Sequence, residues 1–91
     1  MALPPLPRVR IGIVGDYNPA NETHRYTNQA LSSLPDPLEG RWIPTDAVPP
    51  EAALLSWDGL LIAPSSPYRD MDGALRAIRT ARERGLPLLG T

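Results

Sequence analysis

Two adjacent serines, Ser65 and Ser66, follow a short apolar run in the stretch APSSPYRD (63–70). Hydroxyl groups and backbone N–H groups at the end of a buried strand can bind an oxyanion or the polar end of a ligand. The same residue types also form turns that cap a following helix. The residues alone leave both interpretations open, so the elements around them have to be considered.

The rest of the sequence offers few groups for covalent or metal chemistry. It contains no cysteine, which excludes disulfides, thiolate metal sites and a cysteine nucleophile within these residues. The single histidine, His24, has no spaced partner ligands, and we expect its side chain at the surface or half-buried. The stretch GIVGDYNPAN (12–21) lacks the patterns of dinucleotide and P-loop sites. We therefore expect no metal site and no cofactor.

Composition narrows the classes of partner. The net charge is -1 and the sequence pI is about 5.7, which argues against nucleic acid or an anionic membrane surface. No apolar run approaches the roughly 18 residues of a membrane span. The start, MALPPLPRVR, lacks the order of a signal peptide, and we expect a cytoplasmic protein. Arg76, Arg79 and Arg82 are spaced as on a solvated helix face.

Apolar patterns along the chain predict alternating strands and helices. We expect a proline-rich, poorly ordered lead (1–7), strands at 8–16, 41–44, 60–64 and 86–90, and helices at 22–34, 51–57 and 71–84. Asn21 or Thr23 is expected to cap the first helix, and Asp70 and Gly85 to bound the last. The expected inner faces of these two helices are Tyr26, Ala30, Leu31 and Leu34, and Met71, Ala74, Leu75, Ile78 and Ala81.

This alternation predicts a three-layer α/β/α domain with a parallel sheet, flavodoxin-like, in strand order 2-1-3-4. Functional loops of such sheets lie beyond the C-terminal ends of the strands. Those ends are Gly15-Asp16, Thr45-Asp46, 64–66 and Gly90-Thr91. The outer edge of strand 86–90 lacks a neighbour, and we expect it to favour aggregation or oligomerisation.

Three stretches carry a family resemblance: IGIVGDYN, WIPTDAV and, most specifically, DGLLIAPSSPYRDMDGALRAIRTARERGLPLLGT (58–91). Together, residues 9–91 resemble the start of the class I glutamine amidotransferase domain of CTP synthase. They are more similar still to stand-alone proteins related to that region, some of which are selenoproteins. The resemblance implies that 1–91 is the N-terminal portion of one such domain. The complete domain would hydrolyse glutamine through a thioester or selenoester and supply ammonia to an acceptor or a synthetase partner.

The resemblance also assigns roles to individual residues. Gly90 and Thr91 would lead into the nucleophile elbow, with Gly90 kept small by crowding, and the next residue would be the nucleophile. The family's catalytic histidine and glutamate lie further on, so we expect the 91-residue chain to be inactive. In the selenoproteins among these relatives, the nucleophile is a selenocysteine encoded by UGA. If that codon followed codon 91 and were read as a stop, the chain would end at Thr91. A pseudogene, a frameshift or deliberate truncation are the alternatives.

Ser65 and Ser66 would lie at the oxyanion and glutamine site. The family has P-G-G or P-G-S at Pro64-Ser65-Ser66, so Ser66 fits and Ser65 departs from the pattern. Glycine there permits positive φ, whereas a serine forced into that region costs about 1–2 kcal/mol. The departure weakens the case for an oxyanion hole. The other hypothesis is a non-catalytic α/β module that binds a partner.

Overall fold

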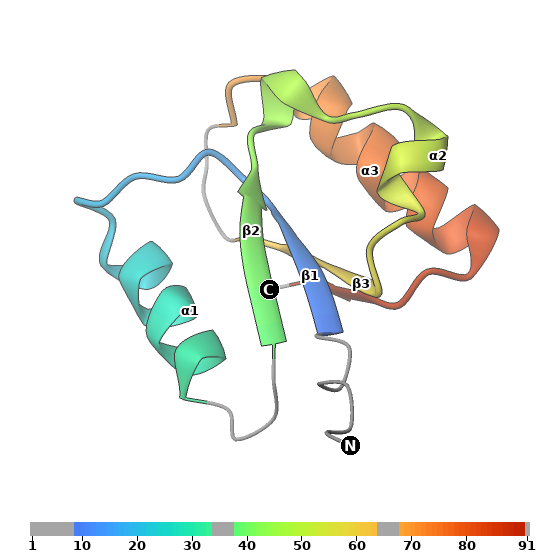
Figure 1. The fold of residues 1–91 in the computed structure, drawn as a ribbon. Coiled ribbons are helices and arrows are strands. Elements are labelled where there is room, and N and C mark those ends of the chain that lie inside the picture. Colours follow the sequence, from blue (N-terminus) through green and yellow to red (C-terminus); the bar gives the residue numbers. More distant parts are fainter. Residues whose placement is uncertain (1–8, 34–37, 64–67, 91) are drawn as a thin grey trace, which may run out of the picture.

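The computed structural model of the chain describes residues 9–33, 38–63 and 68–90. Its elements are β1 (Val9–Val14), α1 (Glu22–Ser32), β2 (Leu38–Ile43), the 3-10 turn η1 (Thr45–Ala47), α2 (Glu51–Leu54), β3 (Gly59–Ile62), α3 (Met71–Arg84) and β4 (Leu88–Gly90). All strand pairs are parallel, in the order β2-β1-β3-β4. Helix α1 lies on one face of the sheet, and α2 and α3 lie on the other (Figure 1). The three-layer, flavodoxin-like prediction is confirmed.

The ends of the long helices follow from single residues. The Asn21 side chain accepts a hydrogen bond from the His24 amide at 3.2 Å, so Asn21 and not Thr23 caps α1. Asp70 accepts a hydrogen bond from the Gly73 amide in the same way and caps α3. Gly85 ends α3 with a φ of 72°, in the left-handed region that favours glycine. The predictions for Asp70 and Gly85 are confirmed.

The second strand is longer than its sequence predicts. We expected 41–44, but β2 begins at Leu38 and pairs residue by residue with β1, from Val9↔Leu38 to Val14↔Ile43. Gly40 and the charged Glu39 and Arg41 weaken the strand pattern, and pairing with β1 overrides that weakness. Helix α2 ends at Leu54, three residues before its expected end. Other boundaries shift less: α1 ends at Ser32, and β4 begins at Leu88. The proline-rich lead lies outside the described residues.

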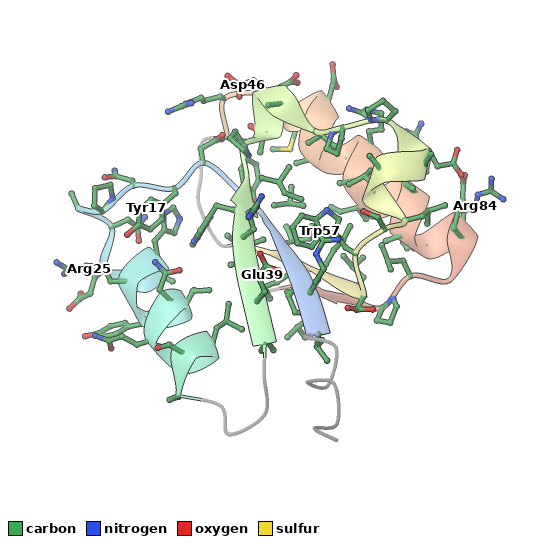
Figure 2. The ribbon with its side chains drawn as sticks, viewed as in Figure 1. Tyr17, Arg25, Glu39, Asp46, Trp57 and Arg84 are labelled. Atoms are coloured by element: carbon green, nitrogen blue, oxygen red, sulfur yellow. The ribbon has the colours of Figure 1, made fainter. Side chains whose placement is uncertain are left out.

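The core fills the space between the sheet and α2/α3. Its buried side chains include Val14, Leu54, Trp57, Leu60, Ala74, Ala77 and Ala81. Figure 2 shows Trp57 between the strands and the two helices. The small alanine side chains allow α3 to approach the sheet closely, so only a narrow strip of the helix surface contacts the core. The predicted inner face is therefore wrong at Met71 and Leu75, which are 51% and 47% exposed.

Helix α1 buries a different side chain from those predicted. His24 is only 1% exposed, whereas Tyr26 is 58% exposed and Ala30 is also at the surface. The expectation of an exposed or half-buried His24 is wrong, because its ring packs 4.8 Å from Trp42 and 6.0 Å from Tyr17, centroid to centroid. A small aromatic cluster therefore attaches the start of α1 to the sheet. Of the predicted inner face, Leu31 is half-buried beside Gly40 of β2, and Leu34 lies outside the described residues.

Candidate functional site

Three segments meet at the C-terminal edge of the sheet through one carboxylate. Asp16 directly follows the Gly15 that ends the β1 run, and its Oδ1 accepts the Thr45 amide at 2.9 Å. Its Oδ2 accepts the Thr45 hydroxyl at 2.8 Å and the Arg69 amide at 2.9 Å. Asp16 therefore joins the end of β1 to η1 and to the residues before α3.

Thr45 extends this network into the start of α3. Its side chain is 1% exposed, and its hydroxyl oxygen accepts the Asp70 amide at 2.9 Å while donating to Asp16. Gly73, in the first turn of α3, lies so close to η1 that an added Cβ would overlap the Thr45 carbonyl oxygen. The beginning of α3 is therefore fixed by hydrogen bonds and by close packing together.

A second set of contacts holds the residues that flank 64–67. The Ala63 amide donates to the Val14 carbonyl at 3.0 Å. The Tyr68 hydroxyl donates to the Ala63 carbonyl at 2.7 Å. Both described residues that border 64–67, Ala63 and Tyr68, are thus hydrogen-bonded to each other or to β1.

The environment of Asp16 favours its ionised form. Burial acts to raise the pKa of this carboxyl, but hydrogen bonds from the Arg69 amide and from the Thr45 hydroxyl and amide, with the nearby Arg69 charge, outweigh it. The net result is a pKa below the ordinary value for aspartate. Because its oxygens already accept three hydrogen bonds, Asp16 holds structure here and is a poor candidate for a general base.

The exposed charges at this edge are paired only loosely. The Arg69 guanidinium lies 4.0 Å from an Asp46 carboxylate oxygen, and both side chains are more than half exposed. Figure 2 shows Asp46 at the end of the sheet where η1 meets the start of α3. No group of three potential metal ligands occurs in 9–33, 38–63 or 68–90.

Of the site residues predicted from the sequence, Gly90 lies within the described part of the chain. Ser65, Ser66 and Thr91 lie outside the described residues. Gly90 ends β4 at this same edge, and an added Cβ would meet no atom within 4 Å. The crowding expected at Gly90 would come from the elbow after Thr91, so it stays a prediction.

Sequence reasoning placed Asp16 and Thr45 at the functional edge, and the structure brings both there. It did not predict the hydrogen bonds between Asp16 and Thr45, because it treated Asp16 only as part of a turn. It also missed Gly73, although a glycine in the first turn of a helix is a signal for close backbone approach.

The surroundings of His24 suit a packing role. Its Nδ1 accepts the Asn18 amide at 3.0 Å, which places the proton of the neutral ring on Nε2. That nitrogen is buried and has no hydrogen-bond partner among the residues the structure describes.

The chain is similar to several curated CTP synthases. The chain is 38% identical over 94 residues to the CTP synthase of Mycolicibacterium gilvum, a match that covers 94% of this chain and 16% of that protein. The CTP synthases of Rhodococcus jostii (37%) and of a Synechococcus species (33%) match 94% of the chain and 16% and 17% of their own lengths. No protein-family model matches, and no solved structure gives a significant match. The chain is thus related to a segment of CTP synthases and spans about a sixth of their length.

In the described part of the chain, no helix has the length and apolar character needed to cross a membrane.

Proposed function

We propose that this chain, related to CTP synthases, forms the N-terminal portion of a glutamine amidotransferase-like domain. The observation that carries the proposal is the similarity over 94% of the chain. The strand order supports it, since β4 ends at Gly90, where the resemblance expects the lead into a nucleophile elbow. A complete domain would hydrolyse glutamine and release ammonia to an acceptor or synthetase partner.

The chemistry would need groups that these residues do not contain. A thiolate or selenolate after Thr91 would attack the glutamine amide carbon, and N–H groups near Ser65 and Ser66 would stabilise the oxyanion. Ammonia would leave, and water would hydrolyse the covalent intermediate to glutamate. Because the chain has no cysteine, we expect the purified 91-residue protein to release no glutamate from glutamine above a heat-treated control.

The coding DNA after codon 91 gives the first test. An in-frame UGA followed by codons for a glycine-rich elbow would support the proposal and its selenoprotein form. A sequence without any such continuation would contradict it.

A protein test uses an extended reading frame with cysteine at the position after Thr91. We expect a diazo-ketone glutamine analogue to alkylate this cysteine with loss of N2, and intact-mass and peptide mass spectrometry to locate the adduct. The matched control carries serine at that position and should remain unlabelled.

Ser65→Gly should keep or raise the labelling rate, because glycine restores the family residue. Ser65→Pro removes an N–H donor and should slow labelling by about 10²–10³ if that donor contacts the oxyanion. Labelling elsewhere would contradict the proposal, and indifference to both changes would contradict the role of Ser65.

A non-catalytic binding module is the second candidate, and one observation favours it. An open groove of about 310 Å³ on the α1 side of the sheet is lined almost entirely by apolar side chains, including Ile11, Leu38, Leu61 and Leu89. Such a face can bind a partner or a second copy, including through the unpaired edge of β4. A monodisperse monomer with cooperative unfolding, together with no open frame after codon 91, would favour this candidate over the amidotransferase.

A further inference from the structure

One carboxylate connects three chain segments that are far apart in sequence. Asp16 is 29 residues from Thr45 and 53 residues from Arg69, and it accepts hydrogen bonds from both. The side chain is half-buried, and Thr45 is almost completely buried. At the opposite edge, by contrast, Asp58 accepts one backbone N–H, from Arg10 at 2.7 Å, and so joins two segments and not three among the hydrogen bonds of the described residues.

The contacts form a chain with a direction. The Asp70 amide donates to the Thr45 hydroxyl, which donates to Asp16. The Thr45 hydroxyl has one hydrogen, which it donates to Asp16, and two lone pairs, one of which accepts the Asp70 amide. An ionised carboxylate accepts from all three of these donors. A protonated carboxyl or an asparagine amide would bring a donor of its own, from which the Thr45 and Arg69 amides cannot accept. Asp16 thereby sets the orientation of Thr45 and the position of the α3 cap.

We propose that Asp16 is a positioning residue, which fixes Arg69 directly and Asp70 through Thr45, and hence holds the start of α3 against the ends of β1 and β2. The relevance of this to glutamine chemistry rests on the proposed function, because Arg69 and Asp70 follow the predicted glutamine-site serines in sequence. The positioning itself does not need that function. It is a property of the 91-residue chain and can be measured without any substrate.

The segments that meet at Asp16 carry three other charged side chains, those of Arg69, Asp46 and Asp70. Arg69 lies next to it, Asp46 on η1 pairs with the Arg69 guanidinium, and Asp70 accepts the Gly73 amide. Hydrogen bonds to an ionised acceptor are stronger than those between neutral groups. We therefore expect the Arg69 and Thr45 amide protons to report one common titration, that of Asp16.

The experiment is amide hydrogen exchange by NMR on the 91-residue chain, with protection expressed relative to the Leu60 amide. That amide bonds the Pro87 carbonyl at 2.9 Å, away from the Asp16 network. Asp16→Asn should lower the relative protection of Arg69 and Asp70 by about ten- to a hundredfold, as expected for losing hydrogen bonds to a charged group. Thr45→Val should do the same for Asp70, and Thr45→Ser, which keeps the hydroxyl, should restore it. Asp58→Asn is the matched control and should leave Arg69 and Asp70 unchanged.

The wild-type chain provides a measurement that does not depend on a variant folding. The Arg69 and Thr45 amide shifts should move together with pH, with one midpoint below the ordinary aspartate value. Unchanged relative protection in Asp16→Asn, an equal loss at Leu60, or separate midpoints would overturn the proposal. If the extended chain forms no covalent adduct while these amides respond as expected, the proposed function fails and the positioning role stands.

Discussion

The two faces of the sheet are covered by helices to different degrees. On the α2/α3 face, Val14, Leu54 and Leu60 are at most 3% exposed. On the α1 face, Ile13 is 1% exposed, but Val9 is 44% and Leu89 is 64% exposed, and an apolar groove remains open. The same strands supply both faces, because alternate residues point in opposite directions. The difference therefore comes from the helices.

The helices differ in what they present to the sheet. Helix α3 offers a row of alanines that lets its backbone approach, and it is tied to α2 by an ion pair between Arg84 and Glu51. Helix α1 is mostly polar, and the one side chain it buries fully is His24. Parallel sheets usually have helices over both faces. Among the described residues, however, α1 leaves apolar surface of β3 and β4 uncovered on its side of the sheet.

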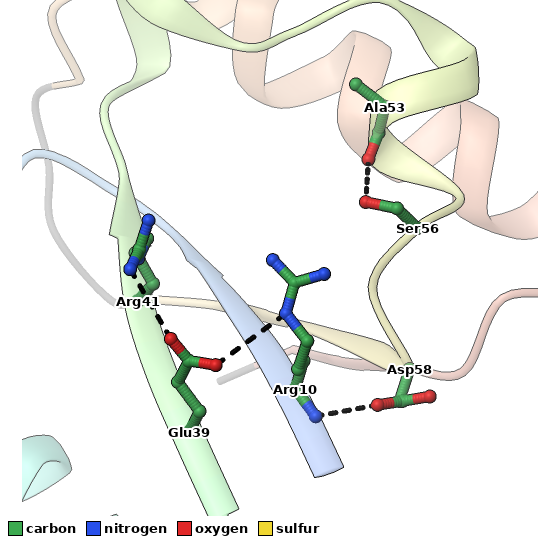
Figure 3. A network of polar contacts seen from close by, with 6 residues as sticks. All are labelled: Arg10, Glu39, Arg41, Ala53, Ser56 and Asp58. Carbon is green, nitrogen blue, oxygen red and sulfur yellow. Dashed lines mark hydrogen bonds and ion pairs between the residues drawn. The ribbon is translucent and has the colours of Figure 1, made fainter. Parts of the chain in front are cut away.

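The two edges of the sheet repeat the contrast. At the β2 edge, Glu39 lies between Arg10 and Arg41, at 3.7 Å and 3.4 Å (Figure 3). The Arg10 guanidinium also lies over the Trp57 ring, 4.4 Å from its centroid. Charged edge strands resist pairing with other chains, whereas β4 consists of Leu88, Leu89 and Gly90. We infer that association, where it occurs, involves the β4 side.

The largest difference between the faces should appear on truncating one leucine from each. Leu54→Ala removes a side chain that is 0% exposed on the α2/α3 face and should lower the free energy of unfolding by about 2–5 kcal/mol. Leu31→Ala, on the half-open α1 face, should cost under about 1.5 kcal/mol, since its neighbours are already near water. Urea unfolding followed by circular dichroism measures both. Equal costs would mean that the α1 face is as well packed as the other.

A matched pair of glycines sharpens the same comparison. In Gly12→Ala, on the α2/α3 face of β1, the new Cβ would lie 2.7 Å from Ile43 Cδ1 and 2.9 Å from Leu60 Cδ2. Overpacking of this kind should cost about 1–3 kcal/mol. In Gly40→Ala, on the α1 face of β2, the nearest atom would be Leu31 Cδ1 at 3.0 Å, the end of a side chain with room to move. Removing a strand glycine gains about 0.5–1 kcal/mol, so this change should be near neutral in urea unfolding. The reverse ranking would contradict the contrast between the faces.

The sequence predicted more of the closed face than of the open one. The alternating pattern and the caps at Asp70 and Gly85 are local signals, and the structure confirms them. The inner face of α1 could not be predicted, because His24 is buried by Tyr17 and Trp42, which come from a loop and from another strand. Periodicity identifies an apolar side of a helix, but which side contacts the sheet depends on tertiary packing.

The site divides in the same way. The rule that functional loops follow strand ends placed Asp16 and Thr45 at one edge, and they meet there. Their bonding to Arg69 depends on a contact across 53 residues, for which a single sequence holds no signal. The roles of Ser65, Ser66 and Thr91 remain predictions, since these residues lie outside the described part of the chain.

Acid should loosen the α3 side through Asp16. The folded-state pKa of this carboxyl lies below its ordinary value, so its contribution to stability is full above the unfolded pKa of about 3.9 and is lost as the pH falls through the lower folded value. In Asp16→Asn the free energy of unfolding should depend less on pH in that window than in the wild type. Urea unfolding between neutral pH and about pH 3 measures this, with Asp58→Asn as control. An identical pH dependence in wild type and Asp16→Asn would show that the carboxylate is not stabilised by its three donors.

The smallest effect on stability, with the largest effect on behaviour in solution, should come from the open face. Leu89 is 64% exposed in β4 and lines the groove beside Leu61 and Ile11. Because Leu89→Lys removes little buried area, the free energy of unfolding should change by no more than about 0.5 kcal/mol. A lysine on this strand introduces the charge that protects natural sheet edges, so self-association should decrease. Sedimentation velocity across a concentration series measures this, and Leu75→Lys, at a 47% exposed position on the outer side of α3, is the matched control. If Leu75→Lys reduces association as much as Leu89→Lys does, the exposed surface of α3 and not the open sheet face mediates the contact.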